Sequence, residues 1–212
     1  MKKRIISIMM AAVMVFTLAG CAKKDEKQVV EVNRVVANDN QTANNDELLS
    51  GKYSVLISIE NYGDIAVELD ADAAPITVTN FMKLVNEGHY TGLTFHRIME
   101  GFMMQGGASI DNPAANIKGE FAMNGINNNI SHERGVISMA RANDPDSASD
   151  QFFICHQDSQ FLDGQYAAFG HVTSGMEVVD KICEEAVVVD NNGTVPPEYQ
   201  PVIKEIIDTT SK

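Results

Sequence analysis

The segment Phe95–Gly107, FHRIMEGFMMQGG, combines a guanidinium and an amide with aromatic and thioether side chains. A buried apolar strand would exclude Arg97, because an isolated charge out of water is very costly. If MEGF forms a tight turn, Arg97 lies opposite Gln105. Met99 then faces Met103, and the alternation of strand residues puts all four side chains on one face. The segment predicts an apolar wall with a cation and an amide beside it, although Arg97 on a rim with its head in solvent is an alternative.

Other chemistries find less support in the composition. The histidines show no metal-ligand spacing and there is no glycine-rich phosphate loop, so we expect no metal and no cofactor; they stand at positions 89, 96, 132, 156 and 171. The formal net charge of −13 argues against a nucleic-acid-binding surface. Cys155 and Cys183 follow apolar residues and are expected to be separate buried thiols. A disulfide between them remains an alternative if the chain is exported.

The first residues have the pattern of a bacterial export signal. A basic start, MKKR, precedes the apolar run IISIMMAAVMVFTL, which is too short for a comfortable membrane span. The run ends in LAGC, and small residues before a cysteine resemble a lipoprotein cleavage box. We therefore predict a lipoprotein signal peptide over 1–20, cleavage before Cys21 and lipidation of Cys21. Two or more acyl chains on one residue would anchor a protein stably to a membrane.

The chain of 212 residues then divides into a tether and one domain. Residues 21–50 begin at the lipidated cysteine, are mostly polar and contain no aromatic side chain, which predicts a flexible, solvated tether. Residues 51–212 alternate like strands in many short runs, which predicts a domain of mainly β structure.

Helix signals occur twice within this domain. Pro75 suits a first helical turn, apolar residues follow at helical spacing, and Gly88 is placed to end the helix. The run MEVVDKIC over 176–183 predicts a second helix. Strand-like runs surround both, at 53–60, 65–70, 94–99, 102–106, 135–140, 151–155, 167–172 and 201–208. Many strands and two helices suggest a closed barrel, which has no exposed edge strand.

Three stretches carry a family resemblance. FHRIMEGFMMQGG, GVISMARANDPDSASDQFFI and FLDGQYAAFGHV contain the elements FHR, GFM, QGG, SMA, QFFI, LDG and FG in order. This ordered set resembles the cyclophilin family of peptidyl-prolyl isomerases, over roughly residues 53–210, and is most similar to its short bacterial branch. The resemblance implies an all-β fold: a closed, eight-stranded antiparallel barrel capped by two α-helices, with an active groove on its outer face.

The resemblance also implies roles for individual residues. Arg97 matches the catalytic arginine of the family, and Gln105 matches the glutamine that holds the substrate backbone. Ala140 and Arg141 match a segment that pairs with substrate. The remaining substrate-binding positions are Phe102, Met103, Gln151, Phe153, Phe161, Leu162 and Tyr166.

Some positions depart from the usual family pattern. Phe161 and Tyr166 occupy positions where well-known members have tryptophan and histidine, and the chain contains no tryptophan. In members sensitive to the drug cyclosporin, that tryptophan donates its indole N–H to the drug. Asp150 stands where serine is usual, and we expect its charge to disfavour acidic substrates.

These features predict an enzyme, a peptidyl-prolyl cis-trans isomerase that accelerates X-Pro rotation in exported proteins by hydrogen bonding to the twisted amide. We expect proline-containing unfolded or exported polypeptides as partners, a monomer, and a lipid anchor on the outer face of the bacterial cell membrane. The alternative is a cyclophilin-like peptide-binding or chaperone module with incidental isomerase activity. The intact set of Arg97, Phe102, Met103 and Gln105 favours the enzyme.

Overall fold

A computed structural model describes residues 47–211 of the chain. The predicted signal peptide, Cys21 and most of the predicted tether lie outside these residues. The strands are β1 (Lys52–Ile59), β2 (Gly63–Asp70), β3 (Phe95–Met99), β4 (Met103–Gly106), β5 (Val136–Met139), β6 (Phe152–Cys155), β7 (Ala168–Ser174) and β8 (Ile203–Asp208). The helices are α1 (Pro75–Asn86) and α2 (Met176–Glu185). The mainly β character and the two predicted helices are confirmed.

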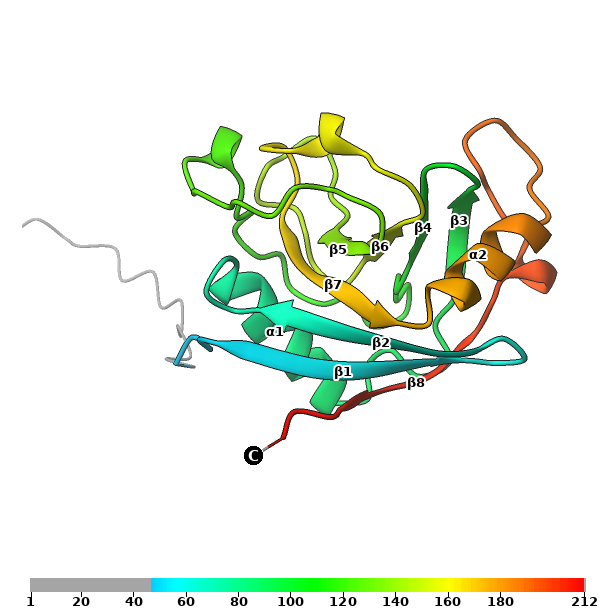
Figure 1. The fold of residues 1–212 in the computed structure, drawn as a ribbon, viewed down its shortest axis with the longest axis horizontal. Helices are drawn as coiled ribbons and strands as arrows, with labels where there is room; N and C mark the ends of the chain where they lie inside the picture. The colour runs from blue at the N-terminus through cyan, green and yellow to red at the C-terminus, as the bar shows by residue number, and fades with distance from the viewer. Residues whose placement is uncertain (1–46, 212) are drawn as a thin grey trace, which may run out of the picture. The chain divides into compact units, whose positions relative to one another are not determined.

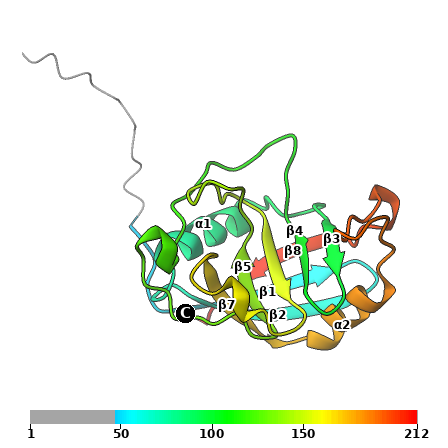
Figure 2. The same cartoon turned by 90° about the horizontal axis from the view of Figure 1, so that it is seen from above.

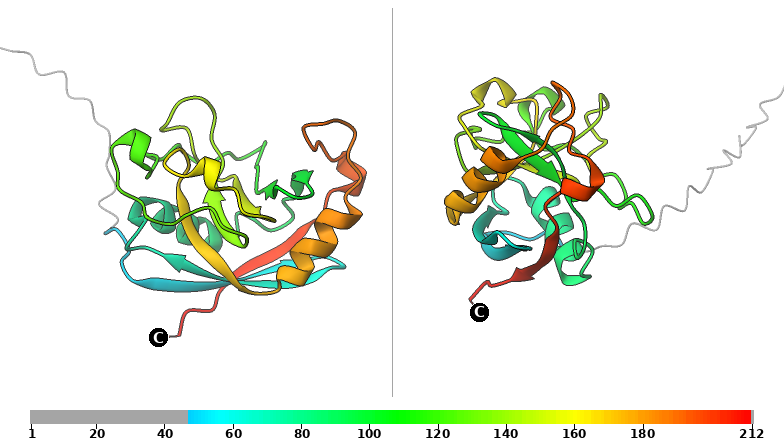
Figure 3. Two further views of the ribbon diagram at one scale, coloured as in Figure 1. Left: turned by 45° about the horizontal axis from the view of Figure 1, so that its top comes forward. Right: turned by 90° about the vertical axis from the view of Figure 1, so that its right-hand side faces the viewer.

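All eight strands belong to one antiparallel sheet with the order β3-β4-β6-β5-β7-β2-β1-β8. Figure 1 shows β1, β2 and β8 along the bottom of the view, and β7 leading up to the strands above them. Figures 2 and 3 show from other sides how the sheet curls. The prediction of a closed barrel is wrong, because β3 and β8 remain the edges of an open, curled sheet. The residues just before β3 and β8 approach each other at an isolated bridge between Thr94 and Val202. Strand β8 itself pairs with β1.

The concave face of the sheet encloses the main core. Alternate residues of β1 and β2 point inward, as Val55, Ile57 and Ile65 illustrate with at most 1% exposure. Aromatic rings fill the centre: Phe81 of α1 lies 5.6 Å from Phe152 of β6, centroid to centroid, in an edge-to-face arrangement. This core holds the strands in register. The side chains on the outer face of β3, β4, β5 and β6 are therefore held in defined positions as well.

Helix α1 receives its N-terminal cap from a distant residue. Pro75 occupies its first turn, where a missing N–H costs nothing. The buried carboxylate of Glu120 accepts hydrogen bonds from the N–H groups of Ile76 (3.0 Å) and Thr77 (2.8 Å), and from the Thr77 hydroxyl (2.7 Å). An anion at a helix N-terminus also interacts favourably with the helix dipole. Glu120 thereby connects α1 to the long segment between β4 and β5.

Helix α2 begins after Gly175, whose φ of +92° favours glycine. It packs against β2 and β4 and buries Cys183. Cys155 is buried in β6, and the two thiols are not joined, which confirms the prediction of separate thiols. Burial raises the pKa of each thiol to about 12, so both are poor nucleophiles near neutral pH. Within residues 47–211, no helix has the length and apolar character needed to cross a membrane.

Candidate active site

Strand register brings four residues into one row on the outer face of the sheet, three of them predicted site residues. Arg97 of β3 pairs with Gln105 of β4, which pairs with Phe153 of β6, which pairs with Ser138 of β5. Met99 pairs with Met103 in the same hairpin, so both pairings predicted from the sequence are confirmed. The row places a cation, an amide and an aromatic ring side by side on β3, β4 and β6, with the Ser138 hydroxyl next to them on β5.

The guanidinium of Arg97 is held from several sides. Its Nε donates to the carbonyl of Asn192 at 2.8 Å, and its Nη1 donates to Oε1 of Gln105 at 3.2 Å. Nη2 lies 3.3 Å from Sδ of Met99, and the guanidinium carbon lies 5.9 Å from the centroid of the Phe102 ring. A guanidinium has five N–H donors in a rigid fork, so these contacts fix its direction and leave donor capacity toward the pocket.

Asn192 belongs to a loop that Asp190 orders. The Asp190 carboxylate accepts hydrogen bonds from the N–H groups of Asn192 (2.9 Å) and Thr194 (3.0 Å), and from the Thr194 hydroxyl (2.8 Å). The bonds from Thr194, first of all, lower the pKa of Asp190. The loop consequently presents the Asn192 carbonyl to Arg97 in a defined position.

A pocket of about 130 Å³ with both apolar and polar side chains in its lining opens beside the guanidinium. Nine of the eleven residues predicted from the sequence to bind or act on substrate line it: Arg97, Phe102, Met103, Gln105, Ala140, Arg141, Phe153, Leu162 and Tyr166. Met103, Phe153 and Leu162 form a small buried cluster, with Phe102 and Tyr166 half-buried against it. The pocket can take a compact apolar group while a polar group beside that ring reaches Arg97.

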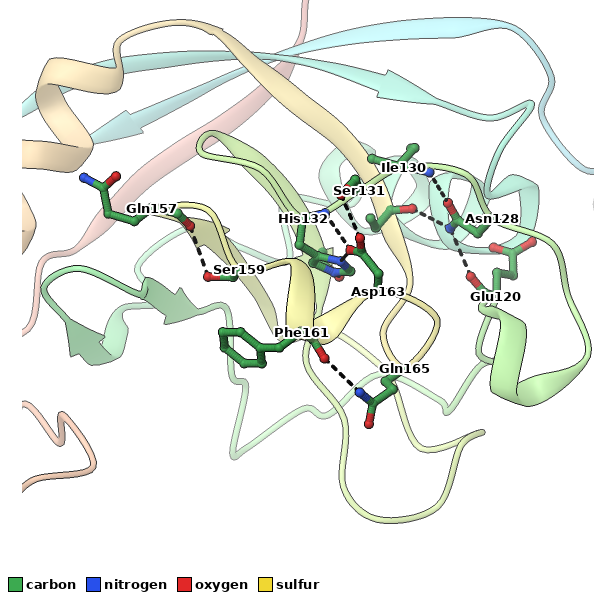
Figure 4. Close-up of polar contacts among 12 residues, drawn as sticks. Glu120, Asn128, Ile130, Ser131, His132, Gln157, Ser159, Phe161, Asp163 and Gln165 are labelled. Atoms are coloured by element: carbon green, nitrogen blue, oxygen red, sulfur yellow. Dashed lines mark hydrogen bonds and ion pairs between the residues drawn. The ribbon is translucent and has the colours of Figure 1, made fainter.

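The other two predicted residues border this pocket without lining it. Gln151 lines an adjoining hollow of about 310 Å³ and accepts a hydrogen bond from Nε2 of Gln105 at 3.1 Å. Phe161 is 66% exposed and packs on Phe102 with 5.5 Å between ring centroids. Its backbone carbonyl accepts a hydrogen bond from Nε2 of Gln165 at 2.8 Å (Figure 4). Gln151 therefore extends the groove, and Phe161 forms its rim.

Arg141 contributes its side chain to one wall of the pocket. Its guanidinium carbon lies 4.8 Å from the ring centroid of Tyr166 and 5.1 Å from that of Phe121. Its Nε donates to the carbonyl of Gln165 at 3.0 Å. Cation–π stacking and this hydrogen bond occupy the head group, so Arg141 braces the wall.

Beneath Phe153 lies a polar row that the sequence reasoning missed. The imidazole of His132 stacks on Phe153 at 6.0 Å; its Nδ1 lies 2.8 Å from the Asp163 carboxylate, and its Nε2 lies 2.9 Å from Oγ of Ser138. Figure 4 shows His132 and Asp163 pointing toward each other. Serine, histidine and aspartate in such contact resemble a nucleophilic triad, but Ser138 is completely buried, so the row supports Phe153 and does no chemistry.

The pKa directions agree with this supporting role. Burial lowers the pKa of His132, although the hydrogen bond with Asp163 opposes the shift. Burial alone would raise the pKa of Asp163, but hydrogen bonds from the His132 N–H, Ser131 and the His132 ring lower it. A neutral imidazole that donates from Nδ1 and accepts at Nε2 fits both partners. No short motif marks this row, because its members meet only through the fold.

Asp150 does not contribute its charge to the groove as expected. It is 2% exposed, and its carboxylate lies 3.2 Å from Nε2 of the equally buried His89. It also accepts a hydrogen bond from the Ser149 hydroxyl at 3.1 Å. The expectation rested on a carboxylate exposed to the groove, and the structure instead buries the Asp150 side chain against His89 and Ser149.

The family model described as cyclophilin type peptidyl-prolyl cis-trans isomerase/CLD matches residues 54–207. The chain belongs to this family. Peptidyl-prolyl cis-trans isomerase A of Dickeya dadantii is 45% identical over 127 residues, which cover 58% of this chain and 67% of that protein. Peptidyl-prolyl cis-trans isomerase B of Bacillus subtilis is 45% identical over 123 residues, covering 56% and 82%.

A solved structure agrees with these sequence relatives. The cyclophilin-type isomerase of Cryptosporidium parvum, crystallised in the presence of the dipeptide Ala-Pro, has a TM-score of 0.64 and 27% identity, covering 74% of this chain and 99% of that one. As a cyclophilin, the chain is an enzyme that isomerises the peptide bond before proline.

Proposed function

We propose that the pocket beside Arg97 is where this cyclophilin twists the X-Pro bond. The observation that carries the proposal is the convergence of the Arg97 guanidinium, the Gln105 amide and several apolar side chains on one pocket of the outer sheet face. A pyrrolidine ring is compact and apolar, and the substrate amide directly beside it is polar. The pocket offers apolar side chains for the ring and polar groups for the amide.

The reaction needs neither a nucleophile nor a proton transfer. Rotation is slow because the proline nitrogen donates its lone pair into the carbonyl, and a barrier of ~20 kcal/mol corresponds to ~10⁻² per second. In the twisted transition state the nitrogen regains its lone pair. A guanidinium donor near that nitrogen stabilises the twisted state more than either planar state, which is the requirement for catalysis.

The other groove residues divide the remaining tasks. Phe102, Met103, Phe153, Leu162 and Tyr166 hold the proline ring, and Gln105 holds the substrate backbone on one side of the rotating bond. Backbone groups at Ala140 and Arg141 pair with the substrate chain, while Gln151 and Phe161 contact residues that flank the proline. When the residues on one side of the X-Pro bond are held in place, rotation is confined to the other side, and binding can stabilise the twisted state.

Replacement of Arg97 tests this assignment. Arg97→Ala should lower kcat/KM for a short X-Pro peptide by about 100- to 1,000-fold, as expected for the loss of one transition-state donor. Arg97→Lys is the matched control, since it keeps the charge without the planar fork and should recover only part of the rate. The assay uses purified protein with no metal or nucleotide added. Full activity in Arg97→Ala would refute the assigned role.

We further propose that the enzyme acts on proline-containing chains outside the cytoplasm. The Ala-Pro dipeptide used with the Cryptosporidium relative supports a proline-containing peptide as ligand. The sequence of 1–20 and the LAGC box support export and a lipid anchor on the outer face of the cell membrane. A monomer is proposed as well, and light scattering after size-exclusion chromatography tests it.

The anchor depends on Cys21 in this proposal. Cys21→Ser should give an unprocessed or soluble product, because lipoprotein processing requires the thiol. The parent protein should partition with membranes and carry acyl mass on its first residue, which mass spectrometry of the purified N-terminal peptide measures. A soluble parent with an unmodified N-terminus would contradict the lipoprotein assignment.

A further inference from the structure

The turn between β3 and β4 is held by a residue from another part of the chain. It spans Met99 to Phe102 and closes with a hydrogen bond from the Phe102 N–H to the Met99 carbonyl at 3.0 Å. The N–H of Gly101 donates outward to Nδ1 of His156 at 2.8 Å. The backbone N–H of His156 donates to the Phe102 carbonyl at 2.9 Å. His156 therefore contacts the turn through both its ring and its backbone.

The ring of His156 is oriented from its other side. Because Nδ1 accepts from Gly101, it carries no proton, and the proton of the neutral ring is on Nε2. Nε2 lies 3.1 Å from Oδ1 of Asp180 on helix α2. Asp180 in turn pairs with Arg134, whose Nη2 donates to Oδ2 at 2.8 Å and whose Nη1 donates to the His156 carbonyl at 2.7 Å. The imidazole is 8% exposed, with a hydrogen bond at Nδ1 and the Asp180 carboxylate close to Nε2.

The turn has a second conformation available to it. The φ of Gly101 is +79°, the value of the third residue in a type II turn. A flip of the peptide between Glu100 and Gly101 would convert this turn to type I, and glycine tolerates both conformations. The flip would turn the Gly101 N–H away from His156. An acceptor at Nδ1 therefore favours the conformation that the structure has.

Both ends of this turn belong to the groove. Phe102 lines the proline pocket, and Sδ of Met99 lies against Nη2 of Arg97. A change in the turn therefore occurs next to the pocket wall and next to one of the contacts that direct the guanidinium. One connection of the turn to helix α2 runs through His156 and Asp180.

We propose that His156 is a positioning residue of this isomerase: with Asp180 behind it, it selects the turn conformation that sets Phe102 and Arg97. The inference rests on the proposed assignment of the groove around Arg97. His156 touches no substrate in this proposal and acts only through the turn.

Two substitutions test the contacts of the two His156 ring nitrogens separately. In His156→Asn, the amide Oδ1 takes the place of Nδ1 and can accept from Gly101, while the contact with Asp180 is lost. In His156→Gln, the amide reaches toward Asp180, and no acceptor remains at the δ position. We expect kcat/KM to fall about tenfold in His156→Gln, in line with the loss of one hydrogen bond. His156→Asn should recover most of that loss.

A second measurement reads the turn without using activity. Hydrogen exchange of the Gly101 amide, followed by NMR, should be faster in His156→Gln than in the parent and slowed again in His156→Asn. Thermal unfolding of both variants provides the control for stability. If either substitution prevents folding, Asp180→Ala replaces it, because the Asp180 side chain is partly exposed. This substitution removes the carboxylate beside Nε2 of His156. It should lower kcat/KM by about threefold and speed hydrogen exchange of the Gly101 amide.

The outcomes are distinguishable from failure of the proposed function. Equal activity in the Asn and Gln variants, with equal Gly101 exchange, would overturn the positioning role even if Arg97→Ala is inactive. Full activity in Arg97→Ala would instead overturn the groove assignment, and the Gly101 exchange rates would still decide whether His156 holds the turn. A tenfold difference between the two His156 variants, at equal stability, supports the proposal.

Discussion

Strand β6 presents two neighbouring residues to two different clusters. Phe152 points into the concave core, where its ring lies within 6 Å of Phe81, Tyr90 and Phe95. Phe153, the next residue, points to the outer face and meets His132 and Tyr166. Their exposures are 0% and 5%, so burial alone hardly separates them.

The difference lies in what covers each ring. The concave cluster is closed by other apolar side chains on the sheet and α1. The outer cluster is covered in part by residues of the connections before β5 and after β6, such as Ile130 and Leu162. It is bordered by Arg97 and Gln105, and the pocket stays open beside it. Side chains alternate between the two faces of the sheet. The candidate active site lies on the face that is only partly covered.

Alanine at each of the two phenylalanines tests this contrast, and it has the largest expected effect. Phe152→Ala should lower the free energy of unfolding by about 3–5 kcal/mol, because it leaves a cavity in a closed core. Phe153→Ala should cost less stability, since one side of its ring already borders an open pocket, but it should reduce kcat/KM strongly. Urea denaturation and the peptide assay measure both. Equal destabilisation with equal residual activity would show that the two faces do not differ in this way.

A change at the rim should have an intermediate effect and leave the core unaffected. Phe161 has no N–H donor, so a buried carbonyl of cyclosporin that a tryptophan would satisfy stays unpaired at a cost of ~1–3 kcal/mol. We expect the parent enzyme to bind the drug weakly and Phe161→Trp to bind it about 5- to 150-fold more tightly, with little change in peptide turnover. Calorimetric titration measures the affinity. Low-nanomolar binding by the parent, or no change in the variant, would contradict this.

Acid should weaken the support beneath the outer cluster, with the smallest effect of the three. Burial lowers the pKa of His132 in the folded protein, whereas the unfolded chain has an ordinary value of ~6.5. As the pH falls below ~6.5, the unfolded state takes up a proton that the folded state does not, so the free energy of unfolding decreases.

The histidine itself provides the control for this pH effect. His132→Gln should flatten the dependence of the unfolding free energy on pH between about 6.5 and 5. Some slope should remain, because burial also lowers the pKa of His96, with a further contribution from Arg97. Denaturation at several pH values measures both slopes, and identical slopes in parent and variant would assign the pH effect to another group.

Local signals were sufficient for most elements and for the hairpin that carries Arg97. Pro75 and Gly88 bracketed α1 correctly, and the turn at Gly101 fixed the pairing of Arg97 with Gln105. These predictions succeeded because each depends on residues within about a dozen positions of one another. The apolar neighbours of Phe153 followed from the family motifs.

Contacts between residues far apart in the chain could not be predicted from the sequence. The open edge between β3 and β8 depends on how far the sheet curls, and strand patterns do not encode this. The contact of His132 with Asp163 spans 31 residues, and that of Gly101 with His156 spans 55. Asp150 was misjudged because its partner, His89, lies 61 residues away. Only the loops determine which polar residues meet across such separations.

The pairing of β1 with β8 has a consequence for how the domain forms. The first and last strands are neighbours, and the hydrogen bond from the Ser54 N–H to the Thr210 hydroxyl joins residues 156 positions apart. Contacts of such high sequence separation slow folding, because a long loop must close before they form. The sheet is also incomplete until the residues of β8 emerge from the ribosome. A nascent chain lacking β8 would expose β1 as an unpaired edge, which is prone to aggregation.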